Sequence, residues 1–98
     1  MRRIFKYKLD VGLSTKIELP EGSEILSVGT QGHDVFFWAL VHVDQKPRTR
    51  MFMVLGTGAQ VPSDVNFIGT VHFHDMGEVY HVFEDVTPDL NVAYEIVI

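Results

Sequence analysis

The chain has 98 residues, of which 46% are hydrophobic and 21% are charged, and its formal net charge is −5. These values are typical of one globular domain with a small core, and they exclude a disordered chain. The absence of cysteine excludes disulfides and thiolate metal sites, and no apolar run reaches the length of a membrane span. We therefore expect a single domain over residues 1–98 that has no membrane segment and no cofactor.

The charges are unevenly distributed along the chain. Residues 1–50 contain all eight Lys and Arg together with six acids, whereas residues 51–98 contain seven acids and no Lys or Arg. Either the folded molecule is dipolar and docks one face on a charged partner, or strands from both halves interleave and mix the charges. The pI near 5.4 argues against nucleic-acid binding, because contact with a phosphate backbone normally requires a positively charged domain.

Alternating apolar and polar residues, with many β-branched and aromatic side chains, recur along the chain, and no window has a helical period. This pattern predicts an all-β fold, either a small antiparallel barrel or a two-sheet sandwich, with about eight short strands. Turn residues such as Pro20, Gly22 and Gly32 separate the strands. The expected strands are residues 3–9, 15–19, 24–31, 35–43, 50–57, 66–74, 78–85 and 92–98.

The segment "VFFWALVHV" at residues 35–43 is the most apolar, so we expect it to be a central strand. Strand alternation places Phe37 on one face, and Phe36 and Trp38 on the other. We interpret Trp38 as a core side chain. The alternative is a platform on which a base or another ligand ring stacks, and this makes Trp38 a candidate binding residue.

The segment "HFHDMGEVYH" at residues 72–81 predicts a β-hairpin in which Gly77 provides the left-handed turn conformation. With a three-residue turn, His72, His74 and Glu78 share a face and are candidate ligands for Zn²⁺ or Fe²⁺, which allows a metal-dependent small β-barrel enzyme. With a turn of two or four residues, His81 joins the histidines instead. We expect the three-residue turn, because Gly77 lies where the left-handed residue is needed. The spacing also resembles the first metal-binding motif of cupins, but the second cupin motif is absent.

Two further stretches are candidates for binding a small anionic ligand such as a nucleotide. Arg48 and Arg50 lie on one side of an extended backbone and could hold a phosphate or an acidic partner. Gly56 and Gly58 free the backbone to point N–H groups at an anion, although the Lys-Ser/Thr of a P-loop is missing. We prefer to interpret them as a bulge or bend after a strand. No nucleophile elbow is present, so the sequence does not predict an enzyme.

Several blocks of the chain together resemble an uncharacterised family of small proteins found in bacteriophage and prophage genomes. These blocks are "IFKYKL", "IELPEGSEILSVGTQ", "FFWALV", "FMVLGTGAQVP", "FIGTVHF" and "YHVFE", and they span residues 4–84. His81 lies in the closing block, whereas His72 and His74 are not part of the family pattern. The resemblance implies a small β-rich domain in the bacterial cytoplasm, with no reaction attached to it.

This resemblance implies that the protein acts by stoichiometric binding of a host or phage protein and blocks a host factor, such as a defence component. Residues 85–98 extend beyond the closing block, and residues 84–98 are a candidate C-terminal extension strand. Their alternating Val92, Tyr94, Ile96 and Ile98 predict an additional edge strand, or a strand that is exchanged with a second copy in a homo-oligomer.

Overall fold

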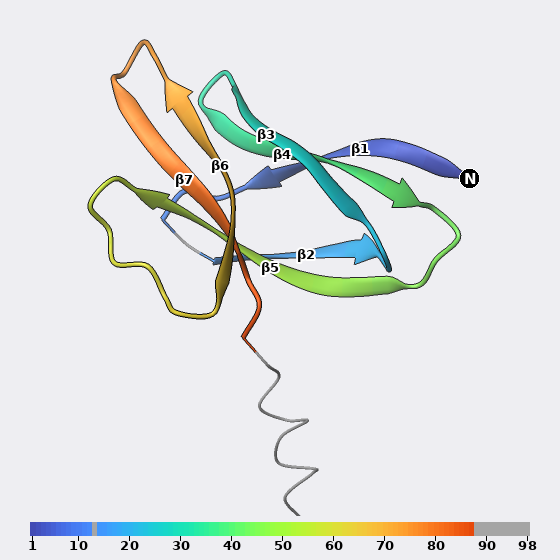
Figure 1. Cartoon of the computed structure of the whole chain (residues 1–98). Helices are drawn as coiled ribbons and strands as arrows, with labels where there is room; N and C mark the ends of the chain where they lie inside the picture. The colour runs from blue at the N-terminus through green and yellow to red at the C-terminus, as the bar shows by residue number, and fades with distance from the viewer. Residues whose placement is uncertain (13, 88–98) are drawn as a thin grey trace, which may run out of the picture.

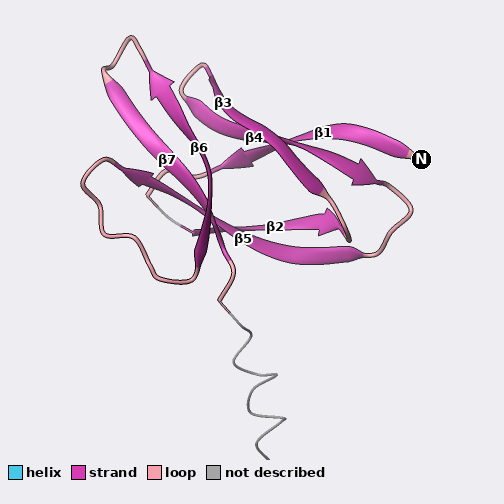
Figure 2. Cartoon of the chain, in the orientation of Figure 1, coloured by secondary structure: helices cyan, strands magenta, loops and turns pink. Residues whose placement is uncertain are grey.

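The computed structural model describes residues 1–12 and 14–87, and this part of the chain contains seven strands and no helix (Figure 2). The all-β prediction is confirmed. The predicted eighth strand at residues 92–98, and with it the predicted exchange with a second copy, lies outside the described residues. The strands are β1 (Arg2–Leu9), β2 (Ser14–Pro20), β3 (Glu24–Gln31), β4 (Asp34–His42), β5 (Pro47–Gly56), β6 (Val65–Phe73) and β7 (Glu78–Asp85).

The strands form two antiparallel sheets that pack as a sandwich and do not close into a barrel (Figure 1). The three-stranded sheet has the order β1-β4-β3, so the apolar strand β4 is central, as expected. The four-stranded sheet has the order β2-β5-β7-β6. Among the described residues no helix has the length and hydropathy needed to cross a bilayer.

The core lies between the two sheets and follows from strand alternation. On β4 the inward residues Val35, Phe37, Ala39 and Val41 are fully buried. The ring of Phe37 lies 4.7 Å from that of Phe52 on the opposite sheet. Burial of one such side chain contributes about 1.5–3 kcal/mol, so a few residues of this kind account for much of the folding free energy of a small domain.

The two sheets approach each other closely at one side of the sandwich, where β3 lies beside β6. The Thr30 hydroxyl donates a hydrogen bond to the carbonyl oxygen of His72 at 3.2 Å. Any side chain at position 69 would place its Cβ 2.7 Å from Cγ2 of Val28, so Gly69 is required for this approach. The absence of a side chain at this position therefore lets the two sheets join here.

A bulge in β6 changes which residues face the core. The pairing with β7 runs from Phe67–Phe83 to Gly69–Val82, so Ile68 is an additional residue on β6. Regular alternation along residues 66–74 predicts that Phe67 shares a face with Val71 and Phe73, and this prediction is wrong. One additional residue reverses the alternation, and Phe67 is therefore 60% exposed on the outer face.

The strand β5 begins at Pro47, whereas the sequence predicted that it begins at residue 50. On one side it pairs with β2, where Pro47 lies opposite Pro20. On the other side β7 begins to pair only at Met51, opposite Asp85. Proline is tolerated at this end of β5 because only one neighbouring strand is present there.

Candidate functional site

The β6–β7 hairpin has a turn of four residues, so the three-residue turn expected from the sequence is wrong. Phe73 pairs with Glu78 and His72 with Val79, which leaves residues 74–77 as the turn. Gly77 has a φ of 67° and provides the left-handed conformation, as expected. Because residues that pair across an antiparallel ladder share a face, Glu78 lies on the inward side with Phe73, away from His72.

His72 and His81 lie on the outer face of the hairpin, but His81 is already engaged. Its Nε2 is hydrogen bonded to the Thr57 hydroxyl at 2.9 Å and its Nδ1 to the Thr70 hydroxyl at 3.0 Å. The rings of His72 and His74 stack on each other with centroids 5.3 Å apart. In residues 1–12 and 14–87 no three His, Cys, Asp or Glu side chains are grouped so that they could hold a metal ion.

Arg48 and Arg50 lie on the same side of β5, as expected, but each is bound to a carboxylate. Nη1 of Arg48 lies 3.2 Å from Glu21 at the exposed end of the sandwich. Arg50 makes two bonds of 2.7 Å to the two carboxylate oxygens of Glu84, and its Nη1 donates to the carbonyl of Ser23 at 2.7 Å. These hydrogen bonds with Glu84 raise the pKa of Arg50.

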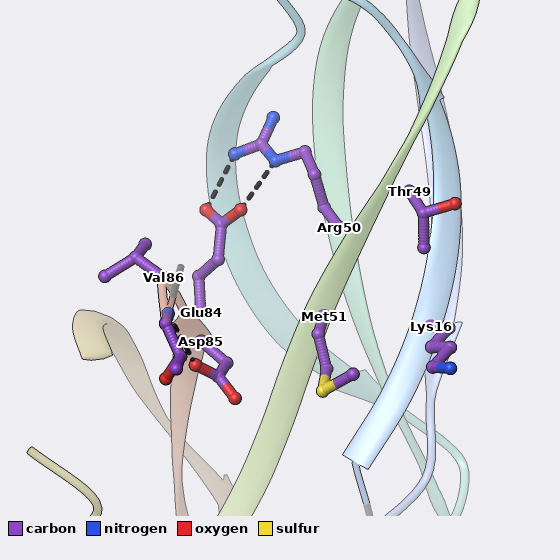
Figure 3. Close-up of a pocket in the computed structure, with 8 residues that line it drawn as sticks. Lys16, Thr49, Arg50, Met51, Glu84, Asp85 and Val86 are labelled. Atoms are coloured by element: carbon purple, nitrogen blue, oxygen red, sulfur yellow. Dashed lines mark hydrogen bonds and ion pairs between the residues drawn. The ribbon is translucent and has the colours of Figure 1, made fainter. Parts of the chain in front are cut away.

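A hollow of about 500 Å³ lies beside this ion pair and is shown in Figure 3. The guanidinium of Arg50 faces Glu84, and Lys16 lies on the other side of the β5 ribbon. The hollow also contains Asp85, whose pKa is lowered mainly by its hydrogen bonds with Thr87. Its two cations are therefore balanced by two acids, an arrangement that does not favour a multiply charged anion.

The two stretches proposed to hold an anion are far apart. Arg48 is near the start of β5 and Gly56 is at its end. Eight residues of extended strand span about 26 Å, so the arginines and the glycines do not form one site. Gly58 has a φ of 92° and lies within a turn closed by a hydrogen bond from the Ala59 N–H to the Gly56 carbonyl. Here the glycines form the bend after a strand.

Trp38 is not a core residue, which corrects our interpretation of the sequence. It is directed away from the core and is partly exposed on the outer face of the three-stranded sheet, two residues from Phe36. The alternation along β4 was correct, but both faces of this strand are apolar, so the pattern could not show which face meets the other sheet. The rings of Phe36 and Trp38 are 6.4 Å apart.

The neighbouring strand β1 brings cations to this face. Lys6 pairs with Trp38 and Lys8 with Phe36 in the β1–β4 ladder. The ammonium group of Lys6 lies 4.7 Å from the centroid of the Phe36 ring and donates a hydrogen bond to Gln31 at 2.9 Å. We call the surface formed by Lys6, Lys8, Phe36 and Trp38 the cation–aromatic face.

The outer face of the four-stranded sheet carries a different feature. Met53 pairs with Phe83, and Phe83 pairs with Phe67. Exposure rises from Met53, which is buried, through the half-buried Phe83 to the exposed Phe67, and the three side chains form a continuous row across β5, β7 and β6. We call this the apolar row. The rings of Phe67 and Phe83 are 5.4 Å apart in an edge-to-face arrangement. The sequence assigned no binding role to Met53 or Phe83. The signal for Met53 is that residues 51–55 are apolar at every position.

Fold and surfaces together define a two-sheet antiparallel β-sandwich whose outer faces both carry aromatic side chains. A protein-family model, described as "Domain of unknown function (DUF7352)", matches residues 1–91, and the chain belongs to this family. No curated protein and no solved structure matches the chain.

Proposed function

We propose that the protein acts by stoichiometric binding of a protein partner and that the apolar row is the centre of the contact. Phe67 carries this proposal, because it is 60% exposed on a regular strand and packs against Phe83. Exposed apolar side chains that form a continuous group on the surface of a soluble domain are typical of binding surfaces, whereas isolated ones need no explanation. Aromatic side chains are also enriched among the residues that dominate binding energy.

The surroundings of the apolar row support a partner with an uncharged, apolar surface. Its neighbours on the same face include Met51, Leu55 and Val65. The nearest charged groups on this face are Lys16 and Asp85, in the next row of the sheet. The centre of such a contact therefore depends on burial of apolar area, and the few charges at its rim contribute mainly to orientation.

The resemblance to phage and prophage proteins adds a candidate for the partner. We propose that it is a host factor of the bacterial cytoplasm, such as a defence component, which the protein blocks by occupying its surface. Capture of a small anion by Arg48 and Arg50 has less support because both arginines face carboxylates. A metal-dependent reaction at His72, His74 and Glu78 has less support because Glu78 lies on the other side of the strand.

The test is affinity purification from bacterial lysate with three baits: the wild-type chain, Phe67→Ser and Leu26→Ser. Leu26 is a matched control, because it is 45% exposed but belongs to the three-stranded sheet. We expect a stoichiometric partner with the wild type and with Leu26→Ser. We expect its loss with Phe67→Ser, since removal of a central aromatic side chain weakens binding by about 2 kcal/mol or more.

Two results would contradict the proposal. Repeated recovery of the wild-type bait alone, from hosts that support the phage, would argue against a stable protein partner. Equal recovery of the partner with Phe67→Ser and with the wild type would show that the contact lies elsewhere. Thermal melts of all three baits establish that Phe67→Ser is folded, which we expect because the ring is largely exposed in the free chain.

A further inference from the structure

The cation–aromatic face consists of two parallel rows in register. On the edge strand β1 the outward residues Arg2, Lys6 and Lys8 carry positive charge, and on β4 the outward residues Phe36 and Trp38 carry aromatic rings. Lys6 lies opposite Trp38 and Lys8 opposite Phe36. Successive outward residues on a strand are about 6.6–6.8 Å apart, so Lys6 and Lys8 repeat at the same interval as Trp38 and Phe36. The exposed Ile4 separates these two lysines from Arg2.

A glycine on the third strand of this sheet determines how the tryptophan ring lies. Gly29 pairs with Phe36 in the β3–β4 ladder. A Cβ at position 29 would lie 3.2 Å from Cζ3 of Trp38, which is closer than an ordinary contact. The ring therefore lies against the backbone of β3. Because no side chain at position 29 lifts the ring off the sheet, the indole lies over β3 and remains partly exposed.

The charge of this face differs from that of the whole chain. Three of the eight cations, Arg2, Lys6 and Lys8, are outward residues of β1. The acids on the strands of this sheet are Glu24 and Asp34. Asp34 lies 3.5 Å from Lys8, while Lys6 is hydrogen bonded to a neutral side chain. The four-stranded sheet carries three more acids on β7. The argument from pI against nucleic acid applies to the chain as a whole and not to this face.

We propose that the cation–aromatic face binds single-stranded nucleic acid, with phosphates along β1 and bases stacked on Trp38 and Phe36. Proteins that bind single strands combine a cationic track for the backbone with aromatic platforms for successive bases. An acidic protein segment would use the same cations, but it would have no use for a second, aromatic row in register with them. This inference concerns a different sheet from the apolar row and is independent of the protein partner.

The experiment uses the full chain and a fluorescein-labelled oligothymidylate of about twelve nucleotides, a length within the usual site size of a small β-domain. Fluorescence anisotropy reports binding, and the single tryptophan of the chain reports stacking. We expect saturable binding with quenching of Trp38. We also expect log K to fall with log salt concentration with a slope of about −2, as for three phosphate contacts.

Two pairs of variants separate this face from the general charge of the protein. Lys6→Gln with Lys8→Gln removes two cations from the face, and Lys16→Gln with Lys46→Gln removes two exposed cations elsewhere. We expect the first pair to weaken binding about tenfold and the control pair to change it less than about threefold. Trp38→Leu should weaken binding about fivefold or more, with all charges unchanged.

Three results would overturn the proposal. The first is no change in anisotropy up to about 100 μM protein at low salt, the weak limit of non-specific binding. The second is equal weakening by both lysine pairs, which would indicate non-specific attraction. The third is equal affinity for a polyglutamate peptide of the same charge, which would assign the face to acidic proteins. Since the lysines are exposed, the Lys6→Gln and Lys8→Gln chain keeps its fold even if Trp38→Leu does not.

Discussion

The two outer faces of the sandwich have similar side chains but different neighbours. On the three-stranded sheet Phe36 and Trp38 lie beside the lysines of β1, whereas on the four-stranded sheet Phe67 and Phe83 lie beside Met53. The first arrangement suits a charged, planar ligand and the second an uncharged surface. An aromatic ring on a sheet therefore does not define a function by itself, because the residues paired with it across the ladder decide which ligands it can bind.

The largest loss of stability is expected from a substitution on the inner face of β4, compared with one on the outer face of the same strand. Phe37→Ala removes a fully buried ring and should lower the free energy of unfolding by about 3–5 kcal/mol. Phe36→Ala, on the outer face of the same strand, should cost about 1 kcal/mol, because its ring is only partly removed from water. Urea unfolding of both variants measures the difference. Equal losses would contradict the assignment of the two faces of β4.

A smaller effect is expected where the two sheets meet. Gly69→Ala forces a Cβ to within 2.7 Å of Val28 and should destabilise the chain by about 1–3 kcal/mol. Combining it with Val28→Ala removes the clashing methyl group and should recover part of the loss in a double-mutant cycle. Gly56→Ala is the control, because a Cβ at position 56 would lie 3.9 Å from its nearest neighbour, Cε1 of Tyr80, which is an ordinary contact. Additive losses at positions 69 and 28 would show that β3 and β6 do not touch as described.

The smallest effect concerns the acid at the rim of the apolar row. Because hydrogen bonds with Thr87 lower the pKa of Asp85, its carboxylate stabilises the fold at neutral pH, and this contribution disappears as the pH falls through its folded pKa. Asp85→Asn should therefore cost less than about 1 kcal/mol above about pH 5, and this cost should shrink as the pH falls through the folded pKa of Asp85. Urea unfolding across this range measures it. If the difference in unfolding free energy between the wild type and Asp85→Asn grew on acidification, this would contradict a lowered pKa of Asp85.

Much of the fold could be predicted from the sequence, because alternation and turn residues are local signals. The seven described strands, the central position of β4 and the role of Gly77 were all predicted. The face of Phe67 was not, because a bulge at Ile68 reverses the alternation without a mark in the sequence. The start of β5 at Pro47 was missed because a proline is excluded only where strands pair on both sides.

The candidate sites depended on less local information. Whether Glu78 shares a face with His72 depends on the length of the hairpin turn. The turn is one residue longer than predicted, so Glu78 lies on the face opposite to that of His72. Arg50 looked available in the sequence, but its partner Glu84 lies 34 residues away along the chain. Trp38 was placed in the core because both sides of β4 are apolar, and only the packing of the second sheet determines which side is buried. Each of these features is set by tertiary structure.

The position of Trp38 is the most direct test of the account, since the cation–aromatic face requires that the second sheet packs on the other side of β4. Trp38 is the single tryptophan, so its fluorescence needs no mutation to assign. On the outer face beside Lys6, it should emit at the long wavelength of a hydrated indole and be quenched more by iodide than by caesium, because the cations attract the anion. Short-wavelength emission without quenching by either ion would place Trp38 in the core and contradict the account.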